Sequence, residues 1–104
     1  MVQGAVRGSL DDRVEPREEV YHRTRATMPD RQSRSVLVVN ISASGLMVRS
    51  DAAVDVGDRI QVVLPTAGEI AATVRWALGG RIGCQFDAPI AAPRYAAVLG
   101  KLDR

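Results

Sequence analysis

EIAATVRWALGGRIGCQF, residues 69–86, contains two strand patterns joined by a tight turn, and this hairpin decides how the rest of the chain is interpreted. Apolar side chains occupy every second position before the turn: Ile70, Ala72, Val74 and Trp76. The alternation resumes after Leu78-Gly79-Gly80 with three more: Ile82, Cys84 and Phe86. A period of two is typical of strands that bury one face. We therefore predict strands over residues 69–77 and 81–86, with Trp76 in the core because it continues the apolar face.

Four further strand patterns precede the hairpin, and turn signals separate them. They cover residues 20–27, 34–40, 45–49 and 59–64. Because the connections are short and an open sheet would leave unpaired edges, we predict a mostly β fold, a six-stranded antiparallel β-barrel. Behind Pro93, apolar residues recur at helical spacing: Tyr95, Val98, Leu99 and Leu102. This pattern predicts a short amphipathic C-terminal α-helix over about residues 92–102.

The composition is that of one small domain. Of the 104 residues, the first 12 are small or polar without a period, so residues 1–12 are predicted to be a flexible tail and residues 13–104 the barrel domain with its helix. The net charge of +2 argues against a protein that coats polyanions. No segment resembles a signal peptide or a membrane span, so we expect a cytoplasmic protein without membrane association. Cys84 is the only cysteine and His22 the only histidine, so we expect neither an intrachain disulfide nor a metal site.

Polar residues gather at the predicted turn between the second and third strands. Asn40-x-Ser42-x-x-Gly45 offers an amide, a hydroxyl and a residue that permits close backbone approach. Upstream lie Arg13 and Arg17, whose guanidinium groups suit bidentate recognition of guanine and phosphate. These residues could together hold a phosphate-bearing guanine ligand. Asn, Ser and Gly are also ordinary turn residues, and exposed arginines often only solubilise a protein, so both interpretations stay open.

In this order, Arg-x3-Arg and Asn-x-Ser-x-x-Gly resemble the PilZ domain family, whose members are receptors for the bacterial second messenger cyclic di-GMP. Later segments extend the resemblance over about residues 11–104, including Val74-Arg75-Trp76 and the stretch of residues 81–87. The family fold is a six-stranded split barrel with a C-terminal helix. The resemblance implies that Arg13 and Arg17 clamp guanine and phosphate while Asn40, Ser42 and Gly45 meet a guanine edge. Arg49 and Trp76 are candidate secondary contacts.

The function that this resemblance implies is that of a receptor and adaptor. Cyclic di-GMP would order the leader that carries Arg13 and Arg17, and the changed surface would signal to a downstream protein, so far unidentified. We expect no cofactor and no enzymatic activity, because no nucleophile, base and orienting group assemble in the sequence around His22.

Two features of the leader distinguish this chain from many family members. Asp12 stands where members that take up a stacked pair of ligand molecules have a further arginine. Five acidic residues also crowd residues 11–19: Asp11, Asp12, Glu15, Glu18 and Glu19. Because carboxylates compete for guanidinium groups and repel a dianionic ligand, we expect weaker binding, or one ligand molecule rather than two.

Two other functions remain open at this point. The first is a protein-interaction adaptor with the PilZ fold that does not bind the nucleotide, supported by the acidic leader and the amphipathic helix. The second, less favoured, is a nucleic-acid binder that uses a local basic patch: Arg23, Arg25, Arg31 and Arg34.

Overall fold

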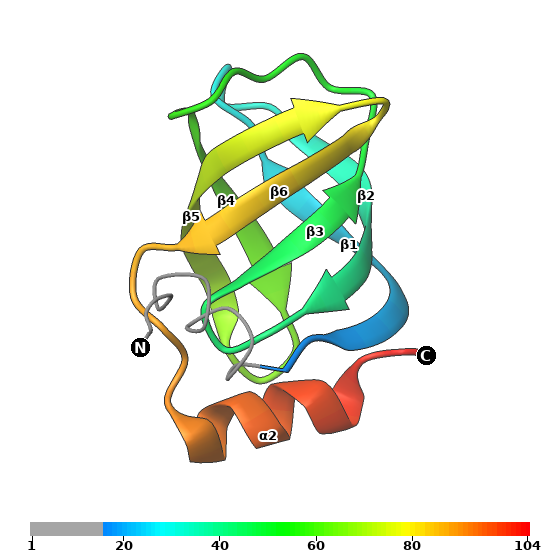
Figure 1. Cartoon of the computed structure of the whole chain (residues 1–104), viewed down its shortest axis with the longest axis vertical. Helices are drawn as coiled ribbons and strands as arrows, with labels where there is room; N and C mark the ends of the chain where they lie inside the picture. Colours follow the sequence, from blue (N-terminus) through cyan, green and yellow to red (C-terminus); the bar gives the residue numbers. More distant parts are fainter. Residues whose placement is uncertain (1–15) are drawn as a thin grey trace, which may run out of the picture.

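A computed structural model describes residues 16–104. It contains six strands and one helix in the order β1 (Glu18–Thr27), β2 (Ser33–Ile41), β3 (Gly45–Arg49), β4 (Arg59–Leu64), β5 (Gly68–Leu78), β6 (Arg81–Phe86) and α2 (Ala92–Lys101) (Figure 1). The strands are all antiparallel and close into a barrel in the order β1-β2-β3-β6-β5-β4. The predicted fold class is confirmed. The predicted boundary between tail and domain lies outside the described residues.

The core fills the barrel because the period-two pattern directs one face of each strand inward. In β4, for example, the buried positions are Ile60, Val62 and Leu64, and the residues between them are exposed. The helix α2 covers one end of the barrel, where Val98 and Leu102 join the same apolar cluster. No helix in residues 16–104 is long and apolar enough to cross a membrane.

The prediction for Trp76 is wrong. The ladder between β5 and β6 shifts by one residue after Val74, so that Val74 pairs with Cys84 but Trp76 pairs with Gly83. This β-bulge places an extra residue, Arg75, in β5 and turns the following side chain to the outer face. Trp76 is therefore 41% exposed rather than buried. Its ring lies on the backbone of Gly83, where an added Cβ would come closer than 3.0 Å to three ring atoms.

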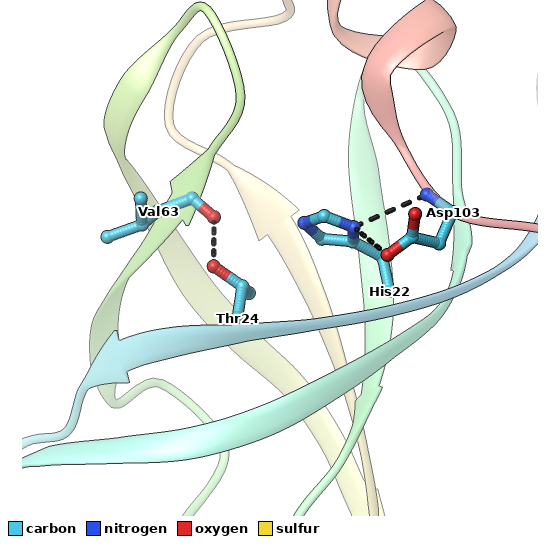
Figure 2. A network of polar contacts seen from close by, with 4 residues as sticks. All are labelled: His22, Thr24, Val63 and Asp103. Carbon is cyan, nitrogen blue, oxygen red and sulfur yellow. Dashed lines mark hydrogen bonds and ion pairs between the residues drawn. The ribbon is translucent and has the colours of Figure 1, made fainter.

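The barrel closes incompletely between its first and fourth strands. β1 pairs with β4 only through Ala26 and Thr27 at its end. Beyond that point the Thr24 hydroxyl donates a hydrogen bond to the Val63 carbonyl oxygen at 2.8 Å (Figure 2). Farther along, the C-terminal segment occupies the free edge of β1. There Asp103 accepts a bond from the Tyr21 amide at 2.9 Å.

Figure 2 also shows how the same segment meets His22. The Asp103 carboxylate lies 3.2 Å from His22 Nδ1, and the Asp103 backbone N–H lies 3.3 Å from it. A neutral Nδ1 accepts the backbone N–H, whereas a protonated Nδ1 donates to the carboxylate. The chain that follows α2 is thus anchored to β1 in either protonation state.

Candidate functional site

The turn between β2 and β3 is held by its own serine. The Ser42 amide donates to the Gly45 carbonyl oxygen at 2.8 Å, and Ser42 Oγ accepts from the Ser44 amide at 3.3 Å. Ser42 is only 7% exposed. A serine hydroxyl that bonds a backbone amide two residues ahead stabilises a turn without any ligand. The turn role that the sequence left open for Ser42 is therefore present in the fold.

Neighbouring segments fix this turn against the end of the barrel. The Ser44 carbonyl oxygen accepts from the Phe86 amide at 2.7 Å, and the Ala43 carbonyl oxygen accepts from the Ile90 amide at 2.8 Å. The Tyr95 hydroxyl of α2 donates to the Ile41 carbonyl oxygen at 3.3 Å. Because three chain segments hold it, the turn is preorganised next to α2 (Figure 1).

Gly45 is required by packing between strands. It pairs with Gln85 at the start of the β3–β6 ladder. A Cβ at this position would lie closer than 3.0 Å to the Cys84 carbonyl oxygen and 3.3 Å from Gln85 Cα. Its φ is not in the left-handed region, so the close approach of β6 is what favours glycine here.

Asn40 lies at a second β-bulge. It pairs with Glu19 of β1 and with Met47 of β3, and the β2–β3 ladder shifts between Val38 and Asn40. Its side-chain amide nitrogen lies 4.0 Å from Met47 Sδ, which is at most a weak contact. Asn40 Oδ1 is buried and has no hydrogen-bond partner. An unpaired buried acceptor costs about 1–3 kcal/mol, so this oxygen is a ready acceptor for a donor that reaches it.

Arg17 enters the fold beside this motif. It directly precedes Glu18, which pairs with Ile41, and the next pair is Glu19 with Asn40. Arg17 therefore lies one residue before the last pair of this ladder, at the end of β2 that leads into the Ser42 turn. Arg17 is exposed. Its predicted companion, Arg13, lies outside the described residues.

A row of outward-facing residues connects Asn40 to Trp76. Consecutive ladder pairs link the members of this Asn40 row across five strands: Glu19, Asn40, Met47, Gly83 and Trp76. Because adjacent strands lie about 4.8 Å apart, Asn40 and Trp76 are roughly 14 Å apart across the outer wall. Neither bulge could be inferred from the alternation of residue types, so sequence reasoning missed Glu19, Met47 and Gly83 as neighbours of the motif.

The other residues singled out from the sequence lie elsewhere. Arg49 is four residues beyond Gly45 on β3, which corresponds to about 13 Å along the strand. It is exposed and pairs with Arg81 and Leu37. It therefore lies outside the Asn40 row.

The predicted basic patch is partly neutralised by local contacts. The guanidinium group of Arg25 donates to the Ser33 hydroxyl at 2.8 Å and to the Ser33 carbonyl oxygen at 3.1 Å. Arg34 lies 3.6 Å from the Asp30 carboxylate. Only the Asp30 contact offsets charge, because serine leaves the charge of Arg25 in place, so the patch keeps most of its positive charge.

The Cys84 thiol lies in the core of the barrel. Burial raises the pKa of the Cys84 thiol to about 12, so this thiol stays protonated and unreactive at neutral pH. Among residues 16–104, no three histidine, cysteine or carboxylate side chains gather as a metal ion would require.

Comparison with known proteins agrees with this geometry. The family model described as PilZ domain matches residues 11–98, a span that includes both sequence motifs, all six strands and most of α2. No curated protein matches the chain. The family model covers most of the sequence, and the closed antiparallel barrel with the motif turn at its α2 end agrees with it. The chain therefore belongs to the PilZ domain family.

Proposed function

We propose that this protein is a cyclic di-GMP receptor whose leader arginines close over the ligand on the Asn40 row, and that the ordered leader then signals to a downstream protein. PilZ domains generally bind this nucleotide. The observation that carries the proposal is the β1–β2 register, in which Glu18 pairs with Ile41 and Glu19 with Asn40. Arg17, the one leader arginine within the described residues, directly precedes Glu18 of this pair, and this position supports the proposal.

Asn40 supplies the second element of the proposed site. Its buried Oδ1 accepts no hydrogen bond from the part of the chain that the structure describes. The N–H groups of a guanine edge are donors that would remove the cost of this unpaired acceptor. Ser42 and Gly45 act mainly by keeping the turn in place, since both have structural roles in the hairpin. Asn40 is therefore the member of the motif whose side chain we expect to recognise the base.

The exposed indole of Trp76 and the half-buried Met47 form an apolar wall in the same row. A planar purine or a ribose could rest on this wall while the arginine holds phosphate. Arg49 remains a secondary candidate, because it lies two residues beyond Met47 on the same face of β3, about 7 Å along the strand.

Charge in the row predicts weak binding. Glu19 is exposed and directly opposite Asn40, and within residues 16–104 no ion pair engages it. Glu18, by contrast, lies 3.5 Å from Arg104. At a separation of about 7 Å in water, Glu19 and one ligand phosphate repel by roughly 0.6 kcal/mol. Glu19→Gln should therefore strengthen binding about threefold at low salt, and by less at high salt.

Titration calorimetry with cyclic di-GMP tests the proposal. Arg17→Ala and Asn40→Ala should each weaken binding by about 1.5–3 kcal/mol, or roughly 10- to 150-fold. Arg34→Ala is the matched control, because this arginine is exposed on β2 near the opposite end of the strand from Asn40. It should bind like the wild type. We expect one ligand molecule per chain.

The alternative is a PilZ-fold adaptor that does not bind the nucleotide, and the acidic Glu19 within the row favours it. No binding by the wild type and by Glu19→Gln at millimolar ligand would establish that alternative. Equal affinity of Arg17→Ala, Asn40→Ala and wild type would instead remove these residues from the site.

A further inference from the structure

A second outward-facing row lies farther along the barrel wall from the Asn40 row. Consecutive ladder pairs link the members of this Arg49 row across five strands: Arg23, Leu37, Arg49, Arg81 and Leu78. It lies toward the end of the barrel opposite α2, where the tip of the β5–β6 hairpin meets the end of β3 (Figure 1). The Ser50 amide bonds the Gly80 carbonyl oxygen there at 2.9 Å.

Three unneutralised positive charges share this row. Arg23, Arg49 and Arg81 are exposed, and within residues 16–104 none of them has an ion pair. Arg49 and Arg81 are direct cross-strand partners, and like charges in this arrangement destabilise a sheet. Two other strand arginines do have carboxylate partners, Arg34 with Asp30 and Arg59 with Asp87. An anionic group between Arg49 and Arg81 would turn a repulsive pair into a bridged one.

Leu37 is a covered apolar residue in the middle of this row. It faces outward with Arg23 on one side and Arg49 on the other, and it is not part of the core cluster. Nevertheless it is only 6% exposed. Arginine stems commonly cover apolar surface while their guanidinium groups stay in water. The guanidinium groups of Arg23 and Arg49 therefore flank a surface from which water is already excluded.

An apolar anchor point adjoins the charged end of the row. Leu78 is 80% exposed, the most exposed large apolar side chain among those described. It borders a shallow depression of about 350 Å³ that also includes Ala53, Ala77 and Arg81. One acidic residue, Asp51, lies on the same rim. The lining of this depression is thus suited to an apolar side chain, while negatively charged groups are favoured beside Arg49 and Arg81.

We propose that the Arg49 row and the Leu78 depression bind an acidic, extended segment of a partner protein that inserts an apolar side chain beside Leu78. Arginine and apolar residues together are typical of protein-interaction hot spots. A nucleic acid gains little from an exposed leucine, because its backbone contributes phosphates and its bases prefer aromatic surfaces. Arg49, Arg81 and Leu78 lie on the consecutive strands β3, β6 and β5. They cover two strand spacings, or about 10 Å, which an extended segment of about three to four residues spans.

Fluorescence anisotropy on the full chain tests this proposal with a labelled synthetic peptide of about eight residues, in which glutamate and leucine stand two positions apart so that both face the barrel from an extended chain. Arg49→Gln combined with Arg81→Gln should weaken binding at least tenfold, and Leu78→Ser at least threefold. Arg34→Gln, an exposed arginine outside the row, should stay within twofold of the wild type. Binding should weaken as salt rises.

The same assay contains the results that would overturn the proposal. These are no binding of the acidic peptide by the wild type, equal binding of a peptide with glutamine in place of glutamate, or an Arg34→Gln effect as large as that of the double variant. Tighter binding of a single-stranded oligonucleotide, lost in the double variant, would identify the row as a nucleic-acid surface instead. A loss of cyclic di-GMP affinity in Arg49→Gln equal to that in Arg17→Ala would assign Arg49 to the nucleotide site. Peptide binding by a chain that does not bind the nucleotide would support the proposal and reject only the receptor function.

Discussion

Gly45→Ala tests whether the motif glycine is required for the stability of the barrel in the absence of any ligand. The added Cβ would overlap the Cys84 carbonyl oxygen, a backbone atom that cannot rotate away. Because ordinary C···O contacts are about 3.3–3.6 Å, β3 and β6 must separate by roughly 1 Å at this point. The five pairs of their ladder begin here, so the strain falls on a main closure of the barrel.

Overpacking of a well-packed site typically costs 1–3 kcal/mol, and we expect the upper part of this range, about 2–3 kcal/mol, because the clash is with backbone. In urea unfolding followed by far-UV circular dichroism, this loss lowers the midpoint by about 1 M or more at an unchanged slope. No ligand is needed for the effect.

Gly100→Ala is the matched control for this substitution. Gly100 lies in α2 with open space around its Cβ position. Alanine is favoured over glycine in a helix by about 0.5–1 kcal/mol, so the midpoint should rise. If Gly45→Ala unfolds within 0.5 kcal/mol of the wild type, a threshold set by the usual spread of neutral surface substitutions, the close approach of β3 and β6 is not what requires glycine.

Three further outcomes follow from the fold. Gly83→Ala should lower the free energy of unfolding by about 1–2 kcal/mol and quench or shift the fluorescence of Trp76, because the indole lies on Gly83. In a Trp76→Ala background the same substitution should cost less than about 0.5 kcal/mol. Additive costs in this double-mutant cycle would contradict the stacking of the indole on Gly83. Thr66 has a φ of 64°, where a β-branched residue is strained, so Thr66→Gly should raise the free energy of unfolding by about 1 kcal/mol, and a lower melting temperature would argue against the strain. Burial raises the pKa of the Cys84 thiol from 9.0 to about 12, so the unfolded chain loses this proton first and the free energy of unfolding should fall as pH rises from 9 toward 12. Cys84→Ala should remove this part of the pH dependence. Rapid alkylation of the native thiol at about pH 8 would contradict the burial.

The number of strands could be predicted from local patterns, whereas the pairing of β3 with β6 and of β1 with β4 could not. Period-two alternation and short connections were sufficient for six antiparallel strands, because hairpin-length links leave neighbouring strands few other partners. Strand ends were less predictable. β2 continues to Ile41, one residue past the predicted end, since the ladder with β1 and β3 extends to that residue. Residue types alone do not show where backbone hydrogen bonding to a neighbour stops.

The candidate site was predictable in its residues but not in its arrangement. Both motifs are visible in the sequence, yet their juxtaposition depends on the register of β1 against β2. The outer neighbours of Asn40 depend on bulges, as the exposed Trp76 shows. A one-residue shift in a ladder exchanges inner and outer faces, and long-range pairing rather than local preference decides where such a shift occurs.

The amino-acid sequence by itself determined the six strand patterns, the C-terminal helix and the two motifs of the family, because side-chain periodicity and turn chemistry are local properties. Tertiary structure alone decided that Ser42 and Gly45 shape the hairpin, that Asn40 retains an unpaired acceptor, and that Trp76 lies on the outer wall. These features arise from contacts between residues far apart in the chain. Only closure of the barrel brings such residues within hydrogen-bonding and van der Waals distance.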